Sequence, residues 1–287
     1  CEPRVNCCSV TPGDLQFPTM NIPGVRVEKH IDFAHVIMCK EPVNTMDTSF
    51  WSTLGEVLTA LEQDSNIRGV IYSSGLKRNV FTAGNDIHEL YIPESNKAKF
   101  TRFWTAQTSF LTQLYRTPLM TIAAIRGACP AGGCIVALSC DARVMTDDPS
   151  SCIGLNEVAL GIAVPKYWCE VMACVAGRRV AQELLTSAAM PKAREALQLG
   201  LVDDVVPSSD LMAAAEKRMV KMLKVPSNGY AVTKAALRND LAIAWDAYMP
   251  AEIETVYAIL SSKECVNALG RVKARLSSGS TSQKAKL

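Results

Sequence analysis

Apolar and polar positions follow a repeating strand and helix pattern through the first two thirds of the chain. Two strand-like segments lie between Val25 and Cys39, and a buried strand, GVIYSSG, covers 69–75. Between them, apolar residues at 50, 54, 57, 58 and 61 recur at helical spacing and predict a helix with one buried face. A longer helix is predicted for 95–116, and its aromatic stripe is interpreted as core.

The stretch from Met120 to Glu157 is the one around which the chain is organised. It runs from an apolar strand through a Gly-rich turn into a short buried helix, then into a second strand and a loop. The turn consists of Pro130, Ala131, Gly132 and Gly133. Because this turn opens a helix, several backbone N–H groups there lack intrahelical partners and lie at the positive end of the helix dipole. The sequence therefore predicts a place that holds a negative oxygen.

Glu157 lies on the loop that ends this stretch, among apolar neighbours such as Ile153, Leu155 and Leu160. Removal from water disfavours the charged form of a carboxyl group and raises its pKa. A carboxyl group in such a setting is suited to carrying a proton. The alternative is an ordinary loop carboxylate in a surface ion pair.

The remaining segments predict an α/β protein with a helical extension. Helices are expected at 166–176, 180–189 and 193–199, and the strand-like LVDDVV follows at 201–206. Repeated strand and helix units of this kind predict a core with largely parallel strands. Beyond residue 210 only amphipathic helices are predicted, at 211–225, 229–245 and 250–268. We expect a flexible arm at 1–20, a core at 21–208, a helical region at 209–268 and a flexible tail at 269–287.

Composition and charge limit the classes of protein to which the chain can belong. With 287 residues and 48% hydrophobic residues, the chain has enough apolar side chains for a sizeable core. The net charge is +2 and charges of both signs are mixed along the chain, which does not indicate nucleic-acid binding. No apolar run approaches the roughly 18 residues that a membrane span needs.

The eleven cysteines are scattered and form no C-x-x-C pair, so neither a metal site nor a disulfide framework is predicted. Cys129, Cys134 and Cys140 are expected to be reduced core residues, which implies a reducing compartment. The chain ends in Ala285, Lys286 and Leu287 after a polar tail. This tripeptide is similar to the S-K-L peroxisomal address and predicts a peroxisomal import receptor as a partner, with the mitochondrial matrix as the alternative location.

Several separate segments together resemble the crotonase (enoyl-CoA hydratase/isomerase) superfamily, and they occur in the family's order from about residue 25 to about residue 260. They are PVNTMD at 42–47, GVIYSSG at 69–75, FTAGNDIHEL at 81–90, AAIRGACPAGGCIVALSCDARVM at 123–145, IGLNEVALGIAVP at 153–165 and EALQLGLVDDVVP at 195–207. Within the superfamily, the motifs around 128–138 and 153–165 look most like the Δ3,Δ2-enoyl-CoA isomerase branch.

The resemblance implies a crotonase-type spiral of ββα units with a C-terminal helical region used in trimer formation, and an acyl-CoA thioester as substrate. A homotrimer is expected, with a hexamer as a further possibility. It implies an oxyanion hole from the backbone N–H groups of Asn85 and Gly132, and Glu157 as the catalytic residue. No cofactor and no metal are expected, since CoA is part of the substrate. Further substrate contacts are expected from Ala83, Gly84, Asp86, Ile87, Ile135 and Asn156.

One position distinguishes hydration from isomerisation among proteins of the family that the chain resembles. Hydratases of the family carry a first glutamate three residues after the oxyanion glycine, where this chain has Ile135. An apolar side chain neither orients water nor gives up a proton, so hydration lacks half of its groups. One carboxylate is sufficient for a 1,3 proton shift, which favours an isomerase that converts 3-enoyl-CoA to trans-2-enoyl-CoA for β-oxidation of unsaturated fatty acids. The alternatives are an enoyl-CoA hydratase and a catalytically idle protein of this fold that binds RNA or a partner.

The chain departs from the family pattern at two positions near the first oxyanion donor. The position of Asn85 is commonly small or apolar in the family, so its side chain either reshapes the acyl pocket or points to solvent. His88 stands where hydratases often have lysine, and we expect it on a helix surface, with contact to the CoA moiety as the alternative. Asp86 and Glu89 are candidates for a second acid, although nothing in the sequence places them over the substrate.

Overall fold

The structure is a computed structural model that describes residues 19–284. Seven strands form one sheet in the order β1-β2-β3-β4-β5-β7-β9, and β6 pairs with β8 in a separate two-stranded sheet. The strand bounds are β1 Thr19–Ile22, β2 Val25–Lys29, β3 Phe33–Met38, β4 Gly69–Ser74, β5 Met120–Ile125, β6 Ala128–Pro130, β7 Ala142–Thr146, β8 Cys152–Gly154 and β9 Asp204–Val206.

Helices fill most of the segments between and after these strands. The α-helices are α1 Thr48–Gln63, α2 Ile87–Leu90, α3 Lys97–Arg116, α4 Gly132–Ser139, α5 Lys166–Ala176, α6 Arg178–Ser187, α7 Ala193–Gln198, α8 Leu211–Met222, α9 Ser227–Leu260 and α10 Lys263–Lys284. Short 3-10 helices are η1 Ile92–Glu94, η2 Glu157–Leu160 and η3 Ser208–Asp210.

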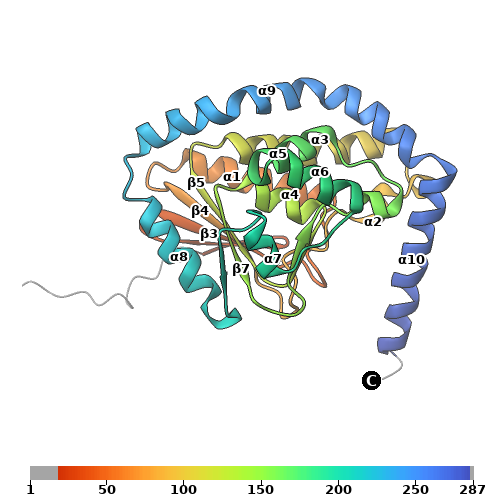
Figure 1. Cartoon of the computed structure of the whole chain (residues 1–287), viewed down its shortest axis with the longest axis horizontal. Coiled ribbons are helices and arrows are strands. Elements are labelled where there is room, and N and C mark those ends of the chain that lie inside the picture. The colour runs from red at the N-terminus through yellow and green to blue at the C-terminus, as the bar shows by residue number, and fades with distance from the viewer. Residues whose placement is uncertain (1–18, 285–287) are drawn as a thin grey trace, which may run out of the picture.

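The central strands are parallel and covered on both faces. From β3 to β9 every neighbouring pair in the large sheet is parallel, while β1, β2 and β3 pair antiparallel. Alternate residues of β4 face opposite cores: Val70 and Tyr72 pack in the larger core, and Ile71 packs in a smaller core with side chains of α8. In Figure 1, α9 arches over α1, α3 and α5, and α8 lies on the other side of the sheet. The predicted α/β class with a C-terminal helical region is confirmed.

The small sheet brings two distant loops together. Pro130 of β6 pairs in parallel with Gly154 of β8. Since parallel strands end at the same edge, the chain enters α4 from β6 beside the point where it leaves β8 for Glu157. The turn and the carboxylate that the sequence singles out are neighbours for this reason.

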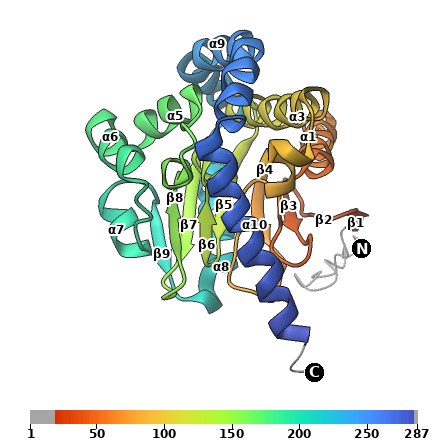
Figure 2. The ribbon, with the colours of Figure 1, turned by 90° about the vertical axis from the view of Figure 1, so that its right-hand side faces the viewer.

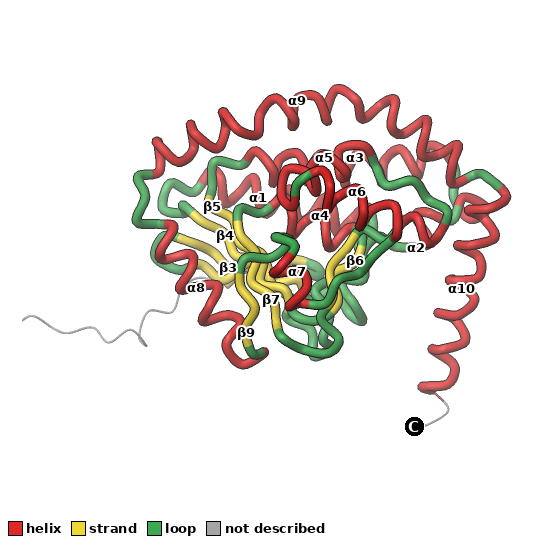
Figure 3. The backbone as a smooth tube through the Cα atoms, viewed as in Figure 1, coloured by secondary structure: helices red, strands yellow, loops and turns green. Residues whose placement is uncertain are grey.

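The C-terminal helices differ from the prediction. In place of helices at 229–245 and 250–268, α9 continues from Ser227 to Leu260 with Pro250 inside it. A proline lacks the N–H for one helical hydrogen bond but does not end a helix that packing supports on both sides. Here Trp245 and Ile253, on either side of Pro250, are both buried. Figure 3 shows the continuous helix.

A flexible tail was expected at 269–287, but residues 269–284 are helical because α10 extends through Lys284. Its apolar residues Cys265, Leu269, Val272 and Leu276 recur at spacings of four and three, which places them on one face of a helix. In Figure 2, α10 descends across the end of the molecule that carries β6 and β8. At the other terminus, residues 19 and 20 of the expected arm belong to β1. The rest of that arm and the tripeptide at 285–287 lie outside the described residues.

Candidate active site

A cavity of about 990 Å³ lies between the loops after β4, β6 and β8 and the C-terminal helices. Its polar lining residues include Arg78, Asn85, Asp86, His88 and Glu157. Its apolar wall comes mostly from segments far apart in the sequence. This wall includes Leu90, Trp104, Leu160, Ile162, Trp168, Val256, Leu260, Leu269, Val272 and Leu276. A cavity with a large apolar surface and a few polar groups fits a ligand that has both kinds of surface.

Glu157 is the first residue of η2 and lines this cavity. Its side chain is only 8% exposed, and neither carboxyl oxygen has a hydrogen-bond partner within the described residues. Burial raises the pKa of Glu157 to about 7, because the loss of water outweighs the smaller, lowering effect of its own backbone N–H. An unpaired buried carboxyl group costs free energy, and groups of this kind concentrate at functional sites. Near neutral pH it can both take up and release a proton.

The turn before α4 holds its backbone in a strained form. Ala131 has φ 48° and ψ −119°, a region that residues with a Cβ atom seldom adopt. Its N–H donates to the Gly154 carbonyl oxygen over 2.9 Å, so the pairing of β6 with β8 keeps it in place. The turn itself is predicted from the sequence, but the positive φ falls on the alanine and not on one of the two glycines that follow it. Such strain is found where a site needs a particular backbone geometry.

A second turn supplies another backbone donor. Gly84 has φ +82°, and its N–H donates to the Thr82 hydroxyl oxygen at 2.9 Å. Met46 bonds the backbone on both sides of Asn85: its N–H donates to the Gly84 oxygen, and its oxygen accepts from the Asp86 N–H. Within the described residues, no oxygen accepts a hydrogen bond from the N–H of Asn85. The same is true of the N–H of Gly132, the first residue of α4.

These two turns are in contact. A Cβ atom built on Gly84 would lie 3.5 Å from the Gly132 nitrogen, and one built on Gly132 would lie 3.5 Å from the Asn85 nitrogen. Two unpaired N–H groups are thus close together beside the cavity, one of them at the start of a helix. Such an arrangement stabilises an oxygen on which negative charge develops.

Other carboxylates near the site are already engaged. Asp86 lines the cavity, but its side chain caps α2 by accepting from the His88 N–H. Glu89 accepts from the Thr48 hydroxyl at 2.9 Å and pairs with Lys99 at 3.3 Å. Glu252 on α9 is buried behind the wall and accepts from the Trp104 indole N–H at 3.0 Å. Of the two acidic residues that line the cavity, only Glu157 lacks a partner within residues 19–284.

The structure brings most of the predicted site residues to this cavity. Those that line it are Ala83, Asn85, Asp86, Ile87, Asn156 and Glu157. Gly84 and Gly132 do not line it, although their neighbours Ala83, Asn85 and Ala131 do. Ile135 does not line the cavity, because it is on the second turn of α4 and fully buried in the core. His88 is exposed at the rim, where its Nδ1 lies 3.4 Å from a carboxyl oxygen of Glu94.

Sequence reasoning missed the apolar wall from α9 and α10. It also assigned the aromatic stripe of α3 wholly to the core, whereas Trp104 is both core and cavity wall. The spacing of Leu269, Val272 and Leu276 is a helical signal that could have extended the prediction beyond residue 268.

No cluster of three or more metal-ligating side chains is found among the described residues. In the same part of the chain, none of the helices has the length and apolar character required to cross a membrane.

Comparison with known proteins gives a consistent result. A family model described as enoyl-CoA hydratase/isomerase matches residues 34–274. The human protein called enoyl-CoA delta isomerase 1, mitochondrial, is 34% identical over 235 residues, which are 82% of this chain and 77% of that protein. Its rat counterpart of the same name is 36% identical over 220 residues, 77% of this chain and 75% of that protein.

Solved structures that resemble this chain include an enoyl-CoA isomerase, as the sequence relatives do. The crystal structure of human mitochondrial delta3-delta2-enoyl-CoA isomerase superimposes with a TM-score of 0.86 at 32% identity, covering 89% of this chain and 99% of the other. An enoyl-CoA hydratase from Bacillus halodurans has a TM-score of 0.79 at 20% identity, covering 86% and 99% of the two chains. The latter likeness shows the shared fold alone.

Proposed function

The chain belongs to the enoyl-CoA hydratase/isomerase family, and we propose that within it this protein is a Δ3,Δ2-enoyl-CoA isomerase. The reaction moves the double bond of a 3-enoyl-CoA to the trans-2 position, which lets unsaturated fatty acids enter β-oxidation. The observation that carries the proposal is the unpaired Glu157 carboxyl group in a cavity that Asn85 also lines, with the unpaired N–H groups of Asn85 and Gly132 on two turns in contact. Similarity to proteins named as enoyl-CoA isomerases supports it.

In the proposed mechanism, Glu157 is the proton carrier. Its carboxylate removes a proton from C2 of the thioester, and the electron pair moves toward the carbonyl to give a dienolate. The N–H groups of Asn85 and Gly132 donate to the dienolate oxygen. The same carboxyl group then returns the proton to C4, which leaves the double bond between C2 and C3. The conversion is redox neutral and moves a single proton, so the proposal needs no cofactor besides the CoA of the substrate.

The cavity suits both parts of an acyl-CoA. Arg78, His88 and Arg275 lie on its wall, and guanidinium groups are effective donors to phosphate. The apolar side chains from α9 and α10 form a surface for the acyl chain. Burial of this surface excludes water, which would keep the proton on Glu157 from exchanging during transfer.

Among residues 19–284, no second unpaired acid lines the cavity to support the hydratase alternative. The position that holds the first glutamate in hydratases is Ile135, which is buried in the core. Asp86 and Glu89, the other candidates for a second acid, are bonded to backbone and side-chain partners. Turnover assays with product analysis distinguish the isomerase from the hydratase. With 3-enoyl-CoA as substrate we expect trans-2-enoyl-CoA as the product. Formation of 3-hydroxyacyl-CoA from trans-2-enoyl-CoA, without double-bond migration in 3-enoyl-CoA, would contradict the isomerase proposal.

We also propose a homotrimer assembled through the C-terminal helical region, as the family resemblance implies. On α9 the large apolar side chains of Val232, Leu237 and Ile243 are exposed in the single chain, which supports an interface there. Light scattering on the purified protein measures the assembly. A mass of three subunits is expected, six would indicate paired trimers, and a monomer at micromolar concentration would contradict the proposal.

For the compartment we propose an organelle matrix. The names of the human and rat relatives include the word mitochondrial, which favours the mitochondrial alternative. The tripeptide at 285–287 favours peroxisomal import through a receptor. Microscopy of the tagged chain with and without Leu287 separates them, because peroxisomal import predicts loss of the punctate signal when Leu287 is removed, whereas mitochondrial import predicts no change.

A further inference from the structure

The side chain of Asn85 connects two helices at the proposed oxyanion hole. The Trp51 indole N–H on α1 donates to the Asn85 Oδ1 at 3.1 Å. The Asn85 Nδ2 in turn donates to the Gln107 Oε1 on α3 at 2.7 Å. Trp51 and Gln107 are both fully buried. The Asn85 side chain therefore points neither freely to solvent nor to a single partner, but is held at both ends.

The direction of this chain of hydrogen bonds is fixed by chemistry. An indole N–H only donates, so it must meet the oxygen of Asn85, and the amide nitrogen of Asn85 must then donate to the oxygen of Gln107. The Nε2 of Gln107 has no hydrogen-bond partner within residues 19–284. A buried donor without a partner is destabilising, because it has lost its hydrogen bonds to water. Three apolar side chains would hold these helices together without leaving a buried donor unpaired. The polar side chains of Trp51, Asn85 and Gln107 therefore indicate a functional role in addition to stability.

The same side chains also contact the second backbone donor. A Cβ atom on Gly132 would lie 3.1 Å from the Asn85 Oδ1 and 3.3 Å from Cζ2 of the Trp51 ring. The indole and the Asn85 amide thus pack directly against the Gly132 Cα. Any shift of the Asn85 side chain would change the positions of both N–H groups relative to each other.

We propose that Trp51 and Gln107 are positioning residues, which fix the Asn85 side chain and through it the two backbone donors of the oxyanion hole. The inference rests on the proposed function, since it concerns the oxygen that those donors bind. Neither side chain donates to the substrate. Their effect is on the transition state, because the donors must be preorganised where negative charge develops. Removal of one oxyanion donor costs about 10²–10³ in kcat, and displacement of a donor should cost part of that.

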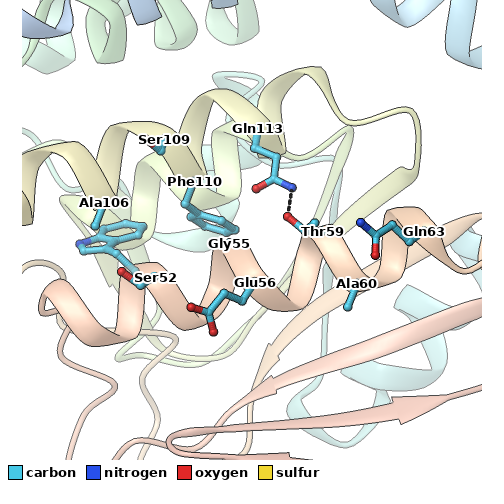
Figure 4. A pocket seen from close by; sticks show the side chains of 11 residues that line it. Ser52, Gly55, Glu56, Thr59, Ala60, Gln63, Ala106, Ser109, Phe110 and Gln113 are labelled. Atoms are coloured by element: carbon cyan, nitrogen blue, oxygen red, sulfur yellow. Dashed lines mark hydrogen bonds between the residues drawn. The ribbon is translucent and has the colours of Figure 1, made fainter.

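The test uses the full chain with Asn85→Leu, Trp51→Phe and the double variant. Asn85→Leu keeps the backbone N–H and a similar volume, and Trp51→Phe removes only the indole donor and one ring. Thr59→Val and Gln113→Leu are the matched controls. Figure 4 shows the hydrogen bond between these two residues, which joins the same two helices in a pocket that neither Asn85 nor Gly132 lines.

Two readouts separate positioning from a merely structural role. The first is kcat and KM for 3-enoyl-CoA isomerisation, per folded subunit. The second is the infrared stretch of a ¹³C-labelled thioester carbonyl in a bound saturated acyl-CoA, which moves to lower wavenumber when donors polarise it. The infrared measurement needs binding but no reaction, so it tests positioning even where turnover is absent.

Each single variant should lower kcat by about 10-fold or more with little change in KM, and should lose part of the carbonyl shift. The double variant should lose little more than either single one, because the residues act as one unit. Both controls should keep kcat and the carbonyl shift.

If Asn85→Leu and Trp51→Phe fold and keep the wild-type kcat and carbonyl shift, the positioning role is overturned while the isomerase proposal stands. If the wild-type protein binds acyl-CoA without isomerising it, the proposed function fails and the infrared comparison alone decides on positioning.

Discussion

A Cβ atom added to Gly132 would lie 3.5 Å from the backbone nitrogen of Asn85 and 3.1 Å from its side-chain oxygen. The same Cβ atom would lie 3.3 Å from the Trp51 ring. Contacts of 3.1 and 3.3 Å are tighter than nine in ten real Cβ contacts, so the Asn85 and Trp51 side chains must shift by a few tenths of an ångström to accept a methyl group.

The first prediction concerns this contact. Gly132→Ala should lower kcat for 3-enoyl-CoA isomerisation by about 10-fold or more with a small change in KM, because displaced donors bind the dienolate oxygen less well. Gly229→Ala on α9 is the control, since a Cβ there meets nothing within 4 Å and alanine favours a helix. Equal kcat in the two variants would show that the contact between the turns has no catalytic role.

The second prediction links Glu157 to stability. Burial raises its pKa to about 7, so the folded protein binds this proton more tightly than the unfolded chain does. This tighter binding of the proton stabilises the folded state. The stabilisation is complete below the unfolded pKa of 4.5 and is lost as pH rises through about 7. Glu157→Gln should therefore stabilise the protein by about 3 kcal/mol at pH 8 and by less than about 1 kcal/mol at pH 5.

Denaturant unfolding of both proteins at the two pH values measures this difference. An equal stability gain at pH 5 and pH 8 would mean that the Glu157 pKa is not raised in the folded state. Glu56→Gln, on the exposed side of α1, is the control for a carboxyl group that is not desolvated.

A third prediction concerns Ile135. Because this side chain is fully buried in the core, Ile135→Glu should not install a hydratase. It should place an unpaired charge among apolar side chains and destabilise the protein by about 3 kcal/mol or more. Ile135→Leu keeps the apolar character and should retain isomerase activity. A stable Ile135→Glu variant that adds water to trans-2-enoyl-CoA would contradict the placement of this residue.

The fourth prediction concerns the helix that covers the cavity. Lys273 on α10 forms an ion pair with Glu94 and lies 5.2 Å from the centre of the Tyr91 ring, beside the α2 segment. Lys273→Met should loosen this attachment and raise KM for acyl-CoA about 2- to 5-fold with little change in kcat, since a half-exposed ion pair contributes at most about 1 kcal/mol. Arg179→Met removes an exposed ion pair with Glu183 on α6 and should leave KM unchanged. A KM equal to wild type in Lys273→Met would show that the attachment does not affect binding.

Much of the fold could be predicted from the sequence because its signals are local. The alternation in β2, the largely apolar run in β3, the helical spacing in α1 and the Gly-Gly turn before α4 each lie within a few residues. Glu157 was identifiable for the same reason, since its apolar neighbours in sequence predict burial. The buried, unpaired state of its carboxyl group agrees with that expectation.

The parts that were missed depend on contacts between distant residues. Trp51, Asn85 and Gln107 are far apart in sequence, so nothing local indicates that their side chains meet. Pro250 predicts a helix boundary locally, but burial of Trp245 and Ile253 supports a continuous helix. The polar residues after Leu276 indicated a tail, whereas the apolar face at 265–276 extends α10 over the cavity.

In the proposed reaction one buried carboxyl group, Glu157, transfers the proton between two carbons of the substrate. This transfer is tested by kcat of Glu157→Gln with a 3-enoyl-CoA, measured beside a wild-type profile of kcat/KM against pH. We expect kcat to fall by about 10² to 10⁴ and the wild-type kcat/KM to rise with pH through about 7, as the carboxylate forms. Near-normal turnover by a folded Glu157→Gln protein would contradict it.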